Sequence, residues 1–228
     1  MQRIRKGLYL LESARVVNCY LIEGPYGLTL FDAGQPLSAP GLIEELENNG
    51  FGFKDVDQIV LSHAHFDHSG GARGLLERRR IKVYAHPDDI PAIQGKGRVP
   101  RGWIMRLREL LLRLKCPYKP VDNVIPIEQG ETLRCLPQWQ VLRAPGHTAG
   151  SIALYHPTDK VLLCGDALNN REGRLRAPAE RNCEDAVLAR ETVRRLGILD
   201  LEVLGCGHGP VIRTSAGLRV QEIVSALT

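Results

Sequence analysis

The stretch Ser62–Gly71, SHAHFDHSGG, places four polar side chains within six residues: His63, His65, Asp67 and His68. On a helix, residues two apart point to different sides, whereas alternate residues of an extended segment share one face. We therefore expect His63, His65 and Asp67 to lie together at the end of the apolar strand that precedes them. His68 then faces a second centre.

Side chains of this kind are costly to hold close together unless an ion offsets the cost. Neutral imidazole and carboxylate are the usual ligands of zinc and similar ions. The alternative is a solvated polar loop with accidental histidines. Because the chain has only 7 histidines in 228 residues, a chance H-x-H-x-D-H pattern has odds on the order of 10⁻⁴. The stretch predicts a metal site.

Further ligands are expected at other strand ends, because one short motif supplies too few for a catalytic site. His147 in APGHTAG, Asp166 in LLCGDAL and His208 in CGHGP each follow an apolar run. A neighbouring glycine lets the backbone bend close to an ion. His86 and His156 precede prolines at strand ends, and we expect them to be structural or surface residues.

The pattern along the chain indicates two strand-rich halves, each closed by helices. We expect a helix at 41–49 that ends at Gly50, a second helix at 183–196 capped by Asn182 and Gly197, and a last helix from Thr214. Residues 88–123 break the rhythm as a helical insertion. The prediction is one domain, 1–228, in which two sheets pack face to face with helices outside.

Composition excludes several classes of protein. The chain is 43% hydrophobic and 25% charged with a net charge of +4, which is typical of a soluble globular protein and does not call for a nucleic-acid partner. No apolar run approaches the ~20 residues of a membrane span. Neither end carries an apolar signal core, so we expect a cytoplasmic protein. The six cysteines stand singly and are expected to be free thiols, with Cys164 in the core.

The motifs TLFDAG, SHAHFDHSGG, APGHTAGS, LCGDAL and GHGP resemble those of the metallo-β-lactamase superfamily, over nearly the whole chain. The resemblance implies an α+β fold, the four-layer αββα sandwich of two mixed sheets. It also implies two divalent metal ions, of which Zn²⁺ is expected and Mn²⁺, Fe²⁺ or Co²⁺ are alternatives. His63, His65 and His147 would hold one ion, Asp67, His68 and His208 the other, and Asp166 would bridge both.

The resemblance does not name a substrate. A secretion signal, a basic RNA-gripping insertion and a flavodoxin-like domain mark the β-lactamase, nuclease and flavoprotein branches, and none is seen in this sequence. The glyoxalase II branch continues past the last histidine into a helical domain, whereas 20 residues follow His208 here. The expectation is a lactonase-like or glyoxalase II-like hydrolase of a small-molecule lactone, carboxylic ester or thioester.

In the mechanism that the resemblance implies, a hydroxide shared between the two ions attacks the carbonyl, and Asp67 acts as a catalytic proton shuttle. Three alternatives remain: a mononuclear iron sulfur dioxygenase, a glyoxalase II-type thioesterase, and metals that only staple the fold. Asp32 has two alternative roles, either accepting a ring N–H from a metal-bound histidine or capping the turn at Gly34.

The insertion carries the sequence RGWIMRLRELLLRLK, whose apolar residues recur at helical spacing. One interpretation is a lid, with Trp103, Met105 and Tyr118 lining a substrate pocket and the Tyr118 hydroxyl facing a substrate carbonyl. The alternatives are a helix that covers the sandwich edge or a homodimer partner, and a helix that lies on a membrane surface.

Overall fold

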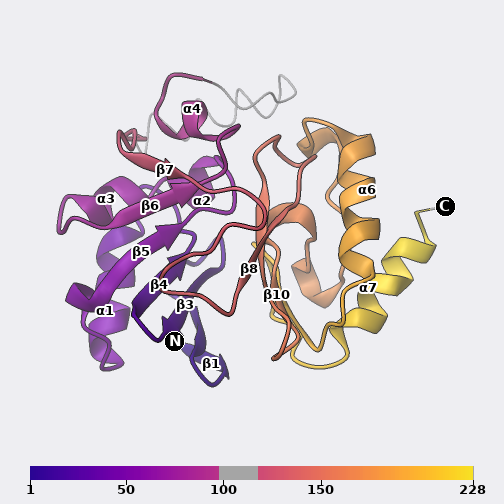
Figure 1. Cartoon of the computed structure of the whole chain (residues 1–228), viewed down its shortest axis with the longest axis horizontal. Coiled ribbons are helices and arrows are strands. Elements are labelled where there is room, and N and C mark those ends of the chain that lie inside the picture. Colours follow the sequence, from indigo (N-terminus) through magenta and orange to yellow (C-terminus); the bar gives the residue numbers. More distant parts are fainter. Residues whose placement is uncertain (98–117, 228) are drawn as a thin grey trace.

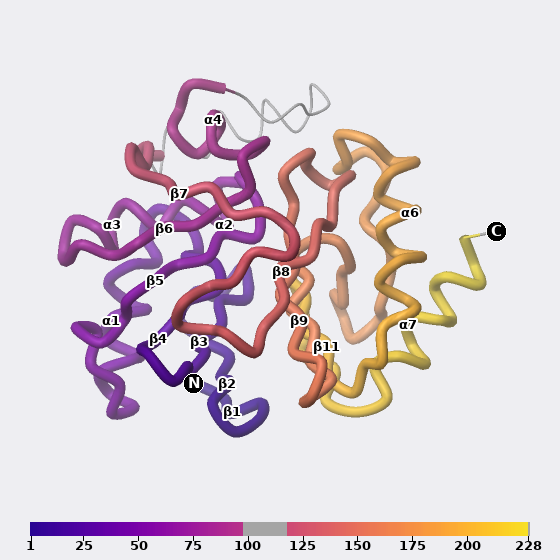
Figure 2. Tube along the Cα trace, viewed as in Figure 1, coloured from indigo at the N-terminus to yellow at the C-terminus, as the bar shows by residue number. Residues whose placement is uncertain are grey.

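Two β-sheets pack face to face with helices on both outer sides, and this αββα arrangement confirms the predicted fold class. The computed structural model describes residues 1–97 and 118–227. In Figure 1, α1 (Ala39–Asn48) and α3 (Ala72–Leu76) lie on one side, and α6 (Ala186–Gly197) and α7 (Ala216–Ser225) on the other. Figure 2 shows that the first half of the chain builds one side and the second half the other.

Among the described residues the first sheet has seven strands and the second has four, and both are mixed. The first contains β1 (Gln2–Arg5), β2 (Leu8–Leu11), β3 (Cys19–Gly24), β4 (Gly27–Phe31), β5 (Val56–Val60), β6 (Lys82–Ala85) and β7 (Val124–Pro126), in that order. The second contains β8 (Gln140–Arg143), β9 (Ile152–His156), β10 (Val161–Leu163) and β11 (Val203–Gly205), in the order β11-β10-β9-β8. Strands β1 to β4 form an antiparallel meander, and β4 to β7 run parallel.

Alternate residues of the central strands point into different apolar layers. On β4, Leu30 packs against the outer helices while Phe31 faces the second sheet. On β10, Leu163 faces the first sheet while Leu162 packs with α6 and α7. This period of two is what a strand buried on both faces requires, and it produces three apolar layers between four layers of secondary structure.

Parallel pairing places strand ends side by side at one edge of the sandwich. Phe31 on β4 is paired with Val60 on β5, and Leu163 on β10 with Gly205 on β11. The segments that follow these four strands carry Asp32, the His63–His68 cluster, Asp166 and His208, and His147 lies in the loop after β8. Strand direction therefore brings together side chains that are far apart in the sequence.

The residues that begin and end α6 differ from the predicted caps, whereas the glycine predicted to end α1 is confirmed. Helix α6 begins at Ala186, and Asp185 is its N-cap, accepting a hydrogen bond from Leu188 N at 2.9 Å. Asn182 was the wrong cap, because it belongs to the short 3-10 turn Glu180–Asn182. Gly197 lies inside the helix, where a Cβ would come within 2.7 Å of Val224. Gly50 follows α1 with φ +83°, as expected of a helix-ending glycine.

The predicted insertion is described only at its ends, where α4 (Ile90–Ile93) is its one helix. Residues 98–117, with Trp103, Met105 and the amphipathic sequence, lie outside the described residues. No helix within 1–97 and 118–227 is both long and apolar enough to cross a membrane.

Candidate metal centre

The histidine cluster follows β5 and turns into a short helix sooner than the sequence suggested. Helix α2 (Phe66–Ser69) begins directly after His65, which has an extended backbone. The helical turn rotates Asp67 away from His63 and His65. Asp67 instead lies in a group with His68 and His208. The expectation that Asp67 shares a face with His63 and His65 was therefore wrong, because the extended segment stops two residues before it.

Three buried imidazoles form the first group, His63, His65 and His147. The Nδ1 atom of His65 lies 3.0 Å from Nε2 of His63 and 2.9 Å from Nε2 of His147. His147 comes from the loop after β8, in the other half of the chain. Three ring nitrogens that converge in this way form a donor set typical of zinc and iron sites.

Asp67, His68 and His208 form the second group, beside the first. His208 Nε2 lies 3.6 Å from a carboxylate oxygen of Asp67. His68 is fully buried, and its Nε2 has no hydrogen-bond partner among the described residues. A buried ring nitrogen without a hydrogen bond is costly, and a metal ion would remove that cost.

Asp166 lies between the two groups. Its Oδ1 is 3.5 Å from His68 Nε2, and its Oδ2 is 3.4 Å from His147 Nε2 and 3.5 Å from His208 Nε2. Asp166 Oδ1 is also buried without a hydrogen-bond partner in the described part of the chain. These separations leave room for cations between donors. The residues present therefore fit two divalent ions that share one carboxylate, the arrangement that the resemblance implied.

The backbone at Gly207 passes close to the Asp166 carboxylate. A Cβ on Gly207 would lie 2.3 Å from Asp166 Oδ1 and 2.6 Å from His68 Cε1. No side chain fits there, so glycine is required beside the shared carboxylate.

The outer ring nitrogens of three histidines are held by the protein. His63 Nδ1 contacts Ser62 Oγ at 2.9 Å, and His208 Nδ1 lies 2.8 Å from the carbonyl of Val16. His68 Nδ1 lies 2.7 Å from Asp32 Oδ2. Such partners fix the tautomer of a ligand and direct its other nitrogen toward an ion.

Asp32 makes its contacts beneath the cluster. Besides His68, it accepts hydrogen bonds from the backbone N–H and the hydroxyl of Ser62, at 2.7 and 2.8 Å. These bonds match the first of the two roles considered for Asp32, the orientation of a histidine ring. That His68 binds a metal remains a prediction.

In the metal-free site the carboxylates and imidazoles shift each other's pKa toward the charged forms. Burial alone favours neutral His68, but the carboxylates of Asp166 and Asp32 outweigh it and raise the pKa of His68 to about 9. Burial likewise favours a neutral Asp166, but His68, His208 and His147 hold the pKa of its carboxyl well below the usual range. Asp166 is thus ionised, as a metal ligand must be.

Sequence reasoning missed Asp89, which touches both histidine loops. Its buried carboxylate accepts hydrogen bonds from Ala64 N at 2.6 Å, Thr148 Oγ1 at 2.8 Å and Gly150 N at 2.9 Å. The only signal was an acid shortly after a strand end, which is common. The partners are backbone groups and a threonine, and these leave no pattern in a sequence.

The remaining selected residues lie outside both groups. His86 and His156 are buried beside Asp88 and Asp159, in keeping with a structural role. The Tyr118 hydroxyl donates to the Ile93 carbonyl at 2.7 Å. Its predicted contact with a substrate, like the lid, remains a prediction.

The described cysteines are free thiols, as expected: Cys19, Cys135, Cys164, Cys183 and Cys206. Cys164 lies in the core, and of these five only Cys183 is not buried.

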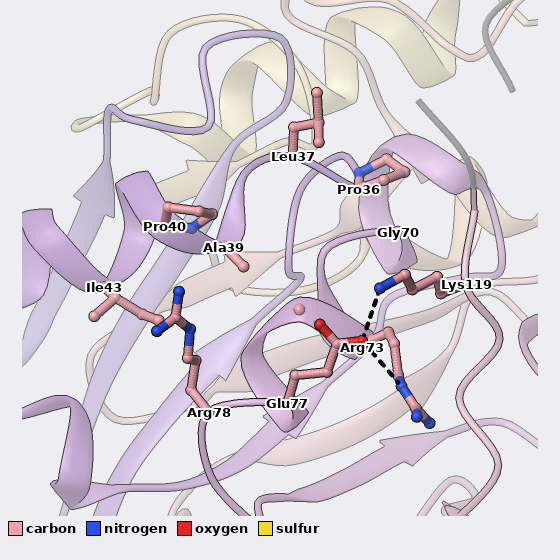
Figure 3. Close-up of a pocket in the computed structure, with 11 residues that line it drawn as sticks. Pro36, Leu37, Ala39, Pro40, Ile43, Gly70, Arg73, Glu77, Arg78 and Lys119 are labelled. Carbon is pink, nitrogen blue, oxygen red and sulfur yellow. Dashed lines mark hydrogen bonds and ion pairs between the residues drawn. The ribbon is translucent and has the colours of Figure 1, made fainter. Parts of the chain in front are cut away.

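A separate groove of about 240 Å³ lies between α1 and α3. Its lining includes Pro36, Ala39 and Ile43, and Figure 3 shows Arg73 and Lys119, which also line it, paired with Glu77. None of the seven candidate ligands lines it. The groove is therefore distinct from the candidate metal centre.

Comparison with known proteins agrees with the geometry. The probable metallo-hydrolase YflN of Bacillus subtilis is 30% identical over 226 residues, which cover 90% of this chain and 84% of that protein. The metallo-beta-lactamase family protein TTHA1429 of Thermus thermophilus has a similar structure, with TM-score 0.72, 25% identity and coverage of 98% of this chain and 80% of that one.

The structure of TTHA1623 in a di-iron-bound form is also similar, with TM-score 0.64, 30% identity and coverage of 86% and 88%. Residues 13–208 match the family model of the metallo-beta-lactamase superfamily, a span that contains all seven candidate ligands. The chain therefore belongs to the metallo-beta-lactamase superfamily and to its metal-dependent hydrolases.

Proposed function

We propose that this protein hydrolyses a small ester-like bond, in a lactone, a carboxylic ester or a thioester, with the help of two divalent metal ions. The observation that carries the proposal is the position of Asp166. Its two oxygens face three histidines, which belong to both donor groups. A carboxylate in that position suits a pair of ions. A structural site, in which metal only stabilises the fold, would not need a carboxylate that faces both donor groups.

A pair of divalent ions supplies a water that is nucleophilic at neutral pH and an electrophile for the substrate carbonyl. The task of the histidines is then to hold these ions at fixed positions, with their outer nitrogens tied to Ser62, Asp32 and the Val16 carbonyl. Zn²⁺ suits the nitrogen-rich first group, and iron, manganese or cobalt would also fit.

Asp67 is the carboxylate best placed to move a proton. Its side chain is 21% exposed, compared with 12% for Asp166 and 1% for Asp32. A substrate that enters from solvent would therefore meet Asp67 before the other two carboxylates, and the alkoxide or thiolate that leaves its carbonyl carbon would be released beside Asp67. We propose that Asp67 carries the proton from the attacking water to this leaving group.

A panel of substrates tests the proposal. Metal-free protein, reloaded with zinc, manganese or iron, is assayed on lactones, aryl esters, thioesters that include a glutathione thioester, β-lactams and phosphodiesters. We expect hydrolysis of at least one of the first three classes, lost on chelation and restored by metal. Activity confined to β-lactams or phosphodiesters would overturn the proposal.

A pair of variants tests the role of Asp166, and two further assays test the alternative activities. Asp166→Asn should reduce turnover by more than about 100-fold, whereas Asp122→Asn, which changes a carboxylate that is 76% exposed, should leave it unchanged. Oxygen uptake with a glutathione persulfide by the iron-loaded protein, without ester hydrolysis, would identify a sulfur dioxygenase instead. A strong preference for the glutathione thioester would identify the glyoxalase II-type activity.

A further inference from the structure

Asp89 joins the two loops that carry the first group of histidines. One carboxylate oxygen accepts from Ala64 N, which lies between His63 and His65, and from the Thr148 hydroxyl. The other accepts from Gly150 N. All three histidines of the first group therefore lie on segments that one carboxylate holds.

These contacts differ from ordinary helix capping. Asp89 occupies the N-cap position of α4, but its side chain makes no capping hydrogen bond to that helix. Its hydrogen bonds go to residues 25, 59 and 61 positions away. The carboxylate therefore serves the distant loops rather than its own helix.

The loops also fit the carboxylate closely. A Cβ on Gly150 would lie 2.6 Å from Asp89 Cγ and from Asp89 Oδ1. Both oxygens must accept, and the groups they meet include two backbone N–H donors. An asparagine side chain has the same shape but only one accepting oxygen, so its NH₂ would face at least one donor.

Besides the contact between the His65 and His147 rings, the described residues join the two histidine loops through the hydrogen bond from Ile152 N to the Ser62 carbonyl at 2.8 Å. That bond lies at the base of both loops, beside the strands. Asp89 ties them nearer the ligands, since its partners Ala64 and Thr148 are sequence neighbours of His63, His65 and His147. In the described part of the chain Asp89 makes no hydrogen bond to a residue of the second group: Asp67 and His68 lie beyond His65 on α2, and His208 follows β11.

We propose that Asp89 is a positioning residue that sets His147 against His63 and His65, and so governs how tightly the first of the two ions is held. The proposal rests on the metal-dependent function proposed above. It predicts an asymmetric effect: loss of the Asp89 carboxylate weakens the ion at the first group and spares the ion at the second.

The test compares Asp89→Asn with Asp88→Asn. Asp88 is its neighbour, but its carboxylate pairs with Arg143 at 3.0 Å and is 46% exposed. Affinities for both ions are measured by competition of Zn²⁺ between protein and a chromophoric chelator, and the visible spectrum of Co²⁺-loaded protein reports the ligand geometry. Thermal unfolding of the metal-free forms reports damage to the fold.

In Asp89→Asn we expect one ion to bind about 10–100-fold more weakly and the other to be unchanged, with an altered Co²⁺ spectrum. Asp88→Asn should match the unmodified protein. Gly150→Ala approaches the same contact from the other side and should reproduce the loss, so the test does not depend on one variant folding.

Unchanged affinities and an unchanged spectrum in both Asp89→Asn and Gly150→Ala would overturn the proposal, as would equal weakening of the two ions. Failure of the unmodified protein to bind any ion would also overturn it. If the unmodified protein binds ions but hydrolyses no ester-like substrate, only the proposed function fails, because this test measures metal binding and not turnover.

Discussion

At the scale of single residues, Asp32 shows how candidate ligands are held by a side chain that belongs to neither donor group. Its carboxylate receives His68 Nδ1 and both polar groups of Ser62, and Ser62 Oγ in turn contacts His63 Nδ1. One buried aspartate thus reaches a histidine in each donor group. The conformation is demanding, since Asp32 has φ +65°.

Asp32→Asn should lower metal affinity and turnover by about 10–100-fold, because an amide cannot accept on both sides and His68 loses its fixed orientation. Chelator competition and steady-state assays measure the two effects. Asp55→Asn, a surface change, serves as the matched control. Full activity in Asp32→Asn would mean that its role is only local to the turn.

Metal uptake should depend on pH through His68. In the metal-free protein the pKa of His68 is raised to about 9: burial opposes the charge, but Asp166 and Asp32 outweigh it. Below pH 9 the imidazolium predominates and must lose its proton before Nε2 can bind an ion. The affinity of the second group should therefore rise by about tenfold per pH unit from pH 7 to 9 and level off above.

The same shift has a consequence for stability without metal. Because the folded-state pKa of His68 exceeds the unfolded value near 6.5, the contribution of His68 to the free energy of unfolding is fully present below pH 6.5. That contribution is lost as pH rises through about 9.

Chelator competition from pH 6 to 10 measures how metal uptake depends on pH. A pH-independent affinity between 7 and 9 would contradict this account of His68.

Residue types and spacing were enough to select all seven side chains that the structure groups together. Asp67 was assigned the wrong neighbours by reasoning from the strand alone, because nothing in HAHFDHS marks where the extended backbone ends. Asp89 could not be selected, since its partners are backbone N–H groups that any residue offers.

At the scale of elements, the start of α6 depends on a cap that the sequence did not reveal. Asp185 and Asn182 both suit an N-cap, and only the fold decides between them. Asp185 N also donates to the Gly146 carbonyl, so the start of α6 is joined to the His147 loop.

Asp185→Ala should therefore lower the free energy of unfolding by about 1 kcal/mol, the usual value of an N-cap side chain. Asn182→Ala is the matched control and should cost little, because Asn182 is in a surface turn. Urea unfolding of the metal-free proteins gives both values. The reverse order would show that the helix begins at the position the sequence suggested.

At the scale of the whole molecule, the sandwich explains why candidate ligands 145 positions apart, His63 and His208, lie in one cluster. Each follows a strand of a different sheet, and the sheets meet face to face at the edge where these strands end. Two strand-rich halves, each closed by helices, predicted the layers, and residue types at strand ends, together with the family motifs, predicted the candidate ligands. Strand order and the contacts across the interface come only from the structure.

The central claim is that one chain holds two ions through a shared Asp166, and stoichiometric titration tests it most directly. Metal-free protein is titrated with Zn²⁺, and bound metal per chain is measured together with hydrolysis of the best ester-like substrate. The account predicts saturation at two ions per chain, with turnover rising until the second ion is bound. Saturation at one ion per chain, with full activity at that point, would contradict it.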